Sequence, residues 1–375
     1  MRHTRGIRIP GVLLTVIALA CAAVLAGGCD GRHYKSEPVL PHLIAESERE
    51  LFPERPVNSF TDTEAVRGTR TEREQMEYLP EILYNRRKPD FTGASAKVKQ
   101  VYDAAVQLLD TYIRNDFTPF ARVHAMHDWL TYYVEYDFAL AARGDAANGN
   151  DPAFGLEGAL LNRKAVCDGY AKAMRLLCGI EGIPCIRITG TFTDDDGQAV
   201  NHAWNKVCIE GVWYNVDATM DAWHVADGNT RYSVINHGYF LVSDDAMHDG
   251  VTGRHEMDDD STANPVNYAC PEDYDFHGTT ALGFGEHRME IVSQDELNSV
   301  FAYVKKQKGK IGRLELKLNF PEYDKSNLLR ANAYVTQIGE AYRKVKDRDY
   351  AFDPDKGYYP YRRYPNGVFV FLFYK

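Results

Sequence analysis

The sequence predicts an α+β fold in which one helix packs on an antiparallel sheet and a small α/β module follows. Apolar residues at helical spacing occupy positions 98–109, a second helix is expected over 119–137 to pack with the first, and a third over 167–179. Segments with strand character joined by short turns come next, which favours antiparallel hairpins. The expected strands cover 185–192, 202–209 and 212–219. The order of helices before sheet therefore defines the fold class.

Composition limits the class of function. The 375 residues are 45% hydrophobic and 26% charged, which suits a folded protein with a sizeable core. The formal net charge is −10 and the sequence pI is about 5.7. Nucleic acids and anionic membrane surfaces attract clustered Lys and Arg, so we expect no nucleic-acid partner.

The first 29 residues have the layout of an export signal. Three arginines precede an uncharged apolar run over 11–28, which ends in small residues directly before Cys29. The motif "LAGGC" resembles a bacterial lipobox, in which the cysteine carries lipid and becomes the new N-terminus. We therefore expect a signal peptide over 1–28 and lipidation at Cys29. A permanent transmembrane anchor is the alternative, because the run is barely long enough to span a bilayer.

The rest of the chain divides into four expected segments. A polar, proline-punctuated tether is followed by a helical extension that Pro80 is expected to interrupt. The main domain and the small α/β module complete the chain. The expected bounds are 29–60 for the tether, 61–95 for the extension, 96–285 for the main domain and 286–375 for the module.

The C-terminal module is predicted from alternating strand and helix patterns. Strands are expected at 288–292, 313–320 and 367–374, and Ser293 and Glu296 form a capping-box pattern at the start of a helix. The intervening loop is rich in tyrosine, at Tyr358, Tyr359, Tyr361 and Tyr364.

Cysteine count points to a reactive thiol. Five of the seven cysteines lie in the expected folded part, and an odd number leaves at least one without an internal partner. A disulfide between Cys185 and Cys208 is one open alternative, since their strands are expected to be neighbours. The spacings contain no CxxC pair, which disfavours structural zinc.

Cys167 stands where a loop becomes a helix. Free backbone N–H groups and the helix dipole at that position stabilise a thiolate, which is the nucleophilic form of cysteine. A two-residue turn at Glu210 and Gly211 would pair Ile209 with Val212. His202 and Asp217 then become diagonal neighbours on one face of the hairpin, within reach of an imidazole–carboxylate hydrogen bond.

Three ordered blocks carry a family resemblance. "NRKAVCDGYAKAMRLLCGIEGIPCIRITG", "NHAWNKVCIEGVWYNVDAT" and "YFLVSDDAM" resemble the transglutaminase-like family of papain-related cysteine enzymes, over about 123–247. The resemblance implies a papain/transglutaminase-like core with a Cys-His-Asp triad, which maps onto Cys167, His202 and Asp217.

The sequence leads to one expected function and one rival. The expected function is an extracytoplasmic, lipid-anchored cysteine enzyme that acts on amide bonds of a peptide or protein through a thioester, and cell-wall peptide is one candidate substrate. Hydrolysis and transfer to an amine both remain open. The rival is a catalytically silent binding or scaffolding lipoprotein at the cell surface, using the tyrosine-rich loop. We expect no cofactor and no metal; the His124 and His127 pair is interpreted as packing.

Overall fold

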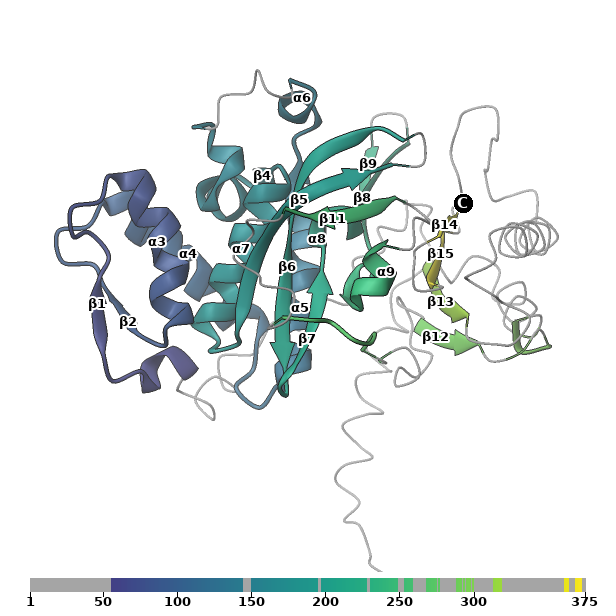
Figure 1. Ribbon diagram of the computed structural model, residues 1–375, viewed down its shortest axis with the longest axis horizontal. Coiled ribbons are helices and arrows are strands. Elements are labelled where there is room, and N and C mark those ends of the chain that lie inside the picture. Colours follow the sequence, from purple (N-terminus) through teal and green to yellow (C-terminus); the bar gives the residue numbers. More distant parts are fainter. Residues whose placement is uncertain are drawn as a thin grey trace, which may run out of the picture. The chain divides into compact units, whose positions relative to one another are not determined.

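The computed structural model describes a mixed helix and sheet protein (Figure 1). The described residues are 55–143, 150–194, 197–227, 230–248, 253–258, 268–274 and 276, with 288–291, 293, 295–297, 299, 313–318, 361–363 and 368–372. The expected signal peptide, most of the tether and Cys29 lie outside them. Among the described residues, no helix combines the length and apolarity needed to cross a bilayer.

Three long helices of the described residues precede the nucleophile helix, namely α3 (Glu72–Tyr84), α4 (Ala96–Tyr112) and α5 (Pro119–Tyr133). A capping box between Thr71 and Glu74 begins α3, and the helix continues through Pro80. The expected interruption at Pro80 is therefore wrong, because Pro80 and its neighbours Leu79, Ile82 and Leu83 are buried and this packing offsets the backbone hydrogen bond that proline lacks. Short elements flank α3, namely η1 (Pro56–Ser59) and the parallel pair β1 (Thr63–Ala65) and β2 (Lys88–Asp90).

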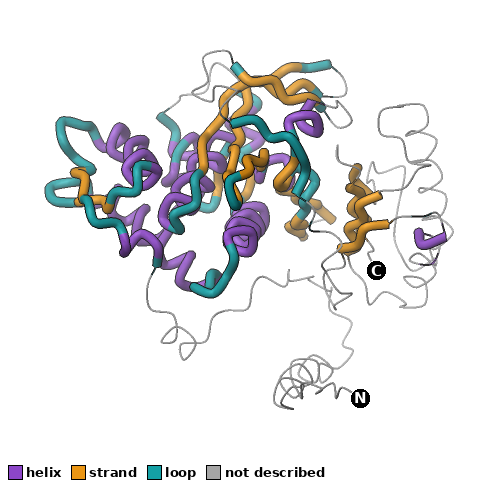
Figure 2. Tube along the Cα trace, turned by 60° about the horizontal axis from the view of Figure 1, so that its bottom comes forward, coloured by secondary structure: helices purple, strands orange, loops and turns teal. Residues whose placement is uncertain are grey.

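The central helix α7 (Cys167–Ile180) begins at the predicted residue. It packs against β5 and β6 of the sheet and against α3, α4 and α5. Ala173, Met174, Leu176 and Leu177 are fully buried in the shared core. Figures 1 and 2 show the helices gathered beside the sheet. The predicted fold class, a nucleophile helix packed on an antiparallel sheet, is confirmed.

The sheet has five strands in the order β10-β7-β6-β5-β11. All neighbouring strands in it run antiparallel. Its strands are β5 (Cys185–Thr193), β6 (Ala199–Ile209), β7 (Val212–Val216), β10 (Phe240–Val242) and β11 (Arg254–Met257). β11 lies within 249–267, which the sequence analysis left without a strand.

The β6–β7 hairpin has the predicted register, with Ile209 opposite Val212. Glu210 and Gly211 both have positive φ, 52° and 90°, as a two-residue type I′ turn requires. The strand ends at Val216, however, earlier than expected. Asp217 leaves the strand and caps the short helix α8 (Ala218–Asp221).

Smaller elements close the edges of this core. The parallel pair β3 and β4 lies just before α7 in the chain, and the antiparallel pair β8 and β9 follows α8. Their bounds, with those of the short helices, are β3 (Glu135–Tyr136), α6 (Phe138–Ala141), η3 (Pro152–Phe154), η4 (Gly158–Asn162), β4 (Lys164–Ala165), β8 (Ala222–Asp227), β9 (Thr230–Ile235) and α9 (Asp244–His248).

The C-terminal segment forms a four-stranded sheet in the order β12-β13-β15-β14. β12 pairs in parallel with β13, and β15 is antiparallel to both its neighbours. The strands are β12 (Arg288–Ile291), β13 (Arg313–Leu318), β14 (Tyr361–Arg363) and β15 (Val368–Leu372). Three of them fall on predicted strands. Whether residues 286–375 fold as a separate module stays a prediction.

Candidate active site

Cys167 is the first residue of α7 and is partly exposed. Val166 precedes it in extended conformation, so the backbone turns into the helix at the thiol itself. Gly169 allows this turn to lie against η3: a Cβ at that position would come within 2.5 Å of the Ala153 carbonyl oxygen and 2.8 Å of the Ala165 Cβ. Only glycine therefore fits there without moving the start of the helix.

His202 and Asp217 meet as the sequence predicted. His202 Nε2 lies 2.6 Å from Asp217 Oδ2, and both side chains are buried. The other carboxylate oxygen, Oδ1, accepts hydrogen bonds from the backbone N–H groups of Thr219 and Met220 at 3.0 and 3.1 Å. Because the cap fixes one oxygen of Asp217, the second is held toward the imidazole.

The thiol, imidazole and carboxylate form one electrostatic unit. Burial alone would lower the pKa of His202, but the charge and hydrogen bond of Asp217, with a smaller contribution from Cys167, raise it to about 10. Burial would raise the pKa of Asp217, but His202 and His255 hold it well below its ordinary value. At neutral pH the structure therefore favours a protonated imidazole between two acidic groups.

His255 is a site residue that the sequence analysis missed. Its Nε2 lies 2.9 Å from Asp217 Oδ2, the same oxygen that His202 contacts. Burial lowers the pKa of His255, and the neighbouring His202 lowers it further, whereas the Asp217 carboxylate raises it. The pKa is lowered on balance. The ring packs between Phe192 and Trp204, at centroid distances of 5.1 and 5.2 Å. Asp217 thus holds one imidazole that favours the charged form and one that favours the neutral form.

Tyr136 lies on the approach to Cys167. It pairs with Ala165 in the β3–β4 ladder, two residues before the cysteine. Burial raises the pKa of Tyr136, and negative charge at Cys167 and Asp217 raises it further. Its ring meets Phe138 edge to face at 4.9 Å, and Phe138 is 70% exposed. Tyr136 is partly buried and Phe138 is largely exposed, so this aromatic pair carries apolar surface out to solvent.

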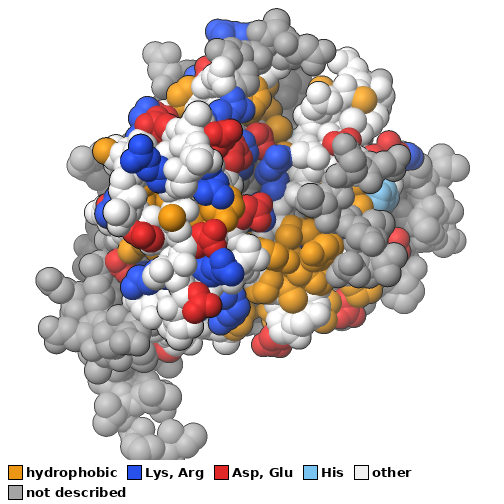
Figure 3. Space-filling model, turned by 60° about the vertical axis from the view of Figure 1, so that its left-hand side comes forward, with side chains coloured by type: hydrophobic (Ala, Val, Ile, Leu, Met, Phe, Trp, Pro, Cys, Tyr) orange, Lys and Arg blue, Asp and Glu red, His pale blue; other side chains and the backbone are white. Residues whose placement is uncertain are grey.

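A cavity of about 310 Å³ lies between α3, η3 and α7. Phe154, Lys172, Arg175 and Arg187 are among its lining residues, whereas none of the three predicted catalytic side chains lines it. Lys172 and Arg187 both pair with Asp168, the residue next to Cys167, at 2.8 and 3.1 Å. Figure 3 shows that charges of both signs are interspersed on the face turned toward the viewer. The cavity thus borders α7 beyond its first turn, at Lys172 and Arg175, rather than lying over the thiol.

The other cysteines of the described core show no cross-link. Cys178, Cys185, Cys208 and Cys270 are all free. Cys185 stands opposite Val207 in the β5–β6 register, so Cys208 points to the other face of the sheet and cannot bridge to it. The alternative disulfide between Cys185 and Cys208 is therefore wrong.

Two clusters of described residues carry ligand atoms within 4.8 Å of one another and could hold a metal ion. One is His202, Asp217 and His255 in the candidate site itself. The other is His124, Asp128 and His237, at a separate position on α5 and the segment before β10. His124 and His202 thus belong to different clusters, and His127 belongs to neither of them.

Comparison with known proteins agrees with the sequence blocks. A model of the transglutaminase-like superfamily matches residues 106–218. The kyphoscoliosis peptidase of Mus musculus is 29% identical over 157 residues, covering 40% of this chain and 23% of its own. The kyphoscoliosis peptidase of Homo sapiens is 31% identical over 144 residues, covering 36% of this chain and 21% of its own. This chain thus spans less than a quarter of the length of these relatives.

Two solved structures were also matched. One is a crystal structure of a TGase, with 14% identity, a TM-score of 0.28, and coverage of 47% of this chain and 40% of that chain. The other is described as a putative cysteine protease from Cytophaga hutchinsonii, with 19% identity and a TM-score of 0.25. That match covers 47% of this chain and 55% of the other chain.

Proposed function

Because residues 106–218 form a transglutaminase-like domain, we propose that this chain is a cysteine enzyme that hydrolyses amide bonds of peptides or proteins through a thioester on Cys167. One observation carries the proposal. His202 interacts with Cys167 on one side and lies 2.6 Å from Asp217 on the other, so a nucleophile, a base and an orienting carboxylate are in contact.

The chemistry follows from these contacts. The Cys167 thiolate attacks the amide carbonyl carbon, and the electron pair of the carbonyl moves onto its oxygen. The protonated His202 then delivers its proton to the amide nitrogen, the C–N bond breaks, and an amine leaves. Water attacks the resulting thioester while His202 removes its proton, and the acid and the thiolate are released. Asp217 holds the imidazole in position through both steps.

The start of α7 supplies one donor for the oxyanion. The first backbone N–H groups of a helix have no partner within the helix, and Cys167 is the first residue of α7. Its own N–H is the natural candidate to bind the negatively charged carbonyl oxygen. The aromatic pair Tyr136 and Phe138 offers apolar contact to a polypeptide, and Tyr136 pairs with Ala165, two residues before Cys167.

Hydrolysis is preferred over amine transfer because the curated relatives are named peptidases. The two fates of the thioester are separable. Purified protein is incubated with a mixture of peptides in heavy-oxygen water, with and without a primary amine, and the products are weighed. Hydrolysis predicts heavy oxygen in new carboxyl termini, while amine adducts alone would show a transferase. Neither product in the wild type, or equal product in Cys167→Ala, would favour the silent binding protein.

The N-terminal sequence supports a proposal about location. The basic start, the apolar run over 11–28 and the "LAGGC" motif support export and lipid attachment at Cys29, which would leave the domain tethered to a membrane on its outer side. Cell-wall peptide is then a candidate substrate. Labelled fatty acid is expected in the wild type and not in Cys29→Ala, and purified membrane-bound protein that still begins at Met1 would contradict the proposal.

A further inference from the structure

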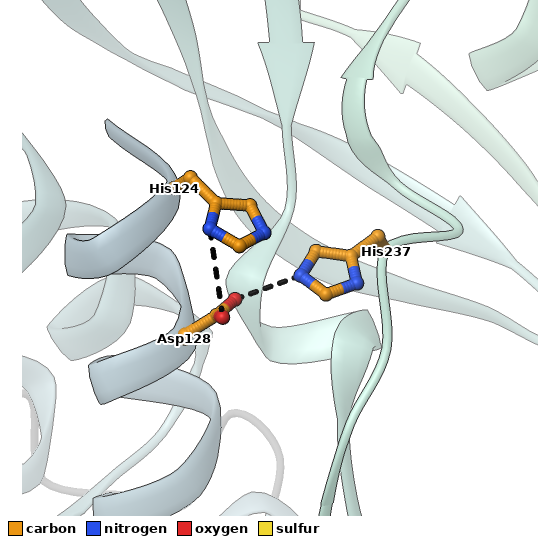
Figure 4. Close-up of side chains that lie close together, drawn as sticks. All are labelled: His124, Asp128 and His237. Carbon is orange, nitrogen blue, oxygen red and sulfur yellow. Dashed lines mark hydrogen bonds and ion pairs between the residues drawn. The ribbon is translucent and has the colours of Figure 1, made fainter. Parts of the chain in front are cut away.

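A second group of histidines and carboxylates lies buried away from the candidate active site. His124 and Asp128 come from one face of α5, and His237 comes from the segment between β9 and β10. Figure 4 shows both imidazole rings directed at the Asp128 carboxylate. His237 and Asp128 are almost fully buried, whereas the His124 side chain is 16% exposed. The cluster therefore has a route to solvent along one side.

From this arrangement we propose that His124, Asp128 and His237 bind a divalent transition-metal ion, with Zn²⁺ as the expected metal. Two imidazoles and one carboxylate are a donor set that suits zinc and its neighbours in the first transition row. The ligand atoms all lie within 4.8 Å of one another, so small side-chain movements bring them onto one ion.

His237 Nε2 lies 2.8 Å from Asp128 Oδ1, which is a hydrogen bond, so an ion bound between these two atoms has to move them slightly apart. His124 Nδ1 lies 3.7 Å from Asp128 Oδ2, which is too long for a hydrogen bond. Two ligand atoms on a tetrahedral zinc ion lie about 3.3–3.6 Å apart, given metal–ligand distances of about 2.0–2.2 Å. The His124 and His237 rings stack at 4.8 Å with an interplanar angle of 11°, so both present an edge to the same carboxylate.

The surrounding residues orient these ligands as partners of metal ligands commonly do. His237 uses Nδ1 to contact Glu315 at 3.0 Å, which leaves Nε2 directed at Asp128. A carboxylate behind a histidine fixes its ring and its tautomer in many metal sites. His127 contacts Asp128 at 3.2 Å and Asp221 at 3.1 Å, so both its nitrogens are used and it supports the cluster rather than joining it.

Charge supplies the last argument. Asp128, Asp221 and Glu315 are three carboxylates that are almost fully buried within this one network. Buried charges are normally paired or bound to metal. His127 and His237 contact these three carboxylates, and Asp221 also accepts hydrogen bonds from the backbone N–H of Tyr239. A divalent cation bound at Asp128 would take over the compensation of its charge from His237, because an imidazole is neutral as a metal ligand. Bound there, the ion would tie α5 to the segment leading into β10 and would be structural.

Binding is tested on the full chain, stripped of metal with a chelator and titrated with Co²⁺ alone and then Zn²⁺ alone. The expected result is one Co²⁺ per chain with visible absorption bands, displaced by Zn²⁺, and a rise in thermal stability with Zn²⁺. His124→Ala, a partly exposed position, should weaken binding by at least about 100-fold while the protein remains folded. Glu315→Gln should weaken it by about 10–100-fold.

Matched variants separate this cluster from other donors. Cys167→Ala and His255→Ala remove donors from the candidate active site, and His248→Ala removes an exposed histidine of α9. All three should still bind one Co²⁺. The proposal is overturned if the wild type binds less than a stoichiometric amount, if His124→Ala binds as tightly as the wild type, or if binding is lost in Cys167→Ala or His255→Ala.

Discussion

Replacing Asp217 with asparagine removes the charge that keeps His202 protonated. The pKa of His202 rises from an ordinary value of 6.5 to about 10, which corresponds to about 5 kcal/mol in favour of the imidazolium. Burial opposes this rise, and Asp217 supplies the largest favourable contribution through its charge and hydrogen bond. Loss of one such charge lowers a pKa by about 1–3 units. In Asp217→Asn the imidazolium should therefore be lost between about pH 7 and pH 9.

The rate at which iodoacetate alkylates Cys167 reports this change. The reagent is an anion, so it reacts fastest while the imidazolium of His202 is beside the thiolate. In the wild type the rate should fall only as pH approaches about 10. In Asp217→Asn the fall should begin about 1–3 pH units earlier. Mass analysis of the Cys167 peptide separates this thiol from the others.

Two controls make the result specific. Neutral iodoacetamide should show no such alkaline fall with either protein. Asp221→Asn removes another buried carboxylate of α8, which contacts His127 instead of His202, and should leave the iodoacetate profile unchanged. If Asp217→Asn and the wild type lose reactivity at the same pH, Asp217 does not hold the charge on His202 and the electrostatic argument is refuted.

The remaining predictions concern packing, positioning and stability. Gly169→Ala places a Cβ 2.5 Å from a backbone oxygen, so it should lower the free energy of unfolding in urea by about 1–3 kcal/mol and slow alkylation of Cys167. Gly155→Ala is the control, because its Cβ would lie 3.6 Å from the nearest atom, and it should change neither quantity. His255→Ala should slow peptide cleavage by about 10–100-fold, because it loses a hydrogen bond to the charged Asp217. His255→Gln keeps an N–H donor and should recover part of the lost rate. Equal cleavage rates in the two variants would show that His255 does not position Asp217. The pKa of His202 is raised and that of Asp217 is lowered, so their pair should stabilise the fold fully between about pH 4 and about pH 6.5. This effect should be lost as pH rises through about 10 and should also weaken in acid as Asp217 is protonated. A pH-independent difference in unfolding free energy between the wild type and Asp217→Asn would contradict the pairing.

Local signals were enough to predict the parts of the site that neighbouring residues determine. The loop before Cys167 and the apolar spacing after it predicted where α7 begins. The two-residue turn sets the register of the β6–β7 hairpin. Side chains alternate between the two faces of a strand, so this register decides which of them share a face. His202 and Asp217 meet for that reason, although Asp217 caps α8 instead of continuing the strand. An aspartate at the end of a strand, followed by helix-forming residues, is the signal that could have predicted the cap.

The parts that depend on distant contacts could not be predicted in the same way. His255 reaches Asp217 from β11, a four-residue strand whose neighbours gave no strand pattern. Its side chain faces the site only because β11 pairs with β5. Helix α5 is buried on nearly every side, including at His127 and Asp128, so its sequence shows no clean polar face. Tertiary pairing, rather than local preference, places these residues.

In the proposed reaction Cys167 forms a thioester with the acyl group of the amide substrate. The direct measurement is the intact mass of the protein during incubation with peptide substrates, followed by digestion to find the modified residue. An acyl adduct is expected on the Cys167 peptide; hydroxylamine should release it, low pH should prolong it, and Cys167→Ala should lack it. Cleavage of peptides without any adduct would contradict the thioester on Cys167. An adduct on another residue that is still formed in Cys167→Ala would contradict it as well.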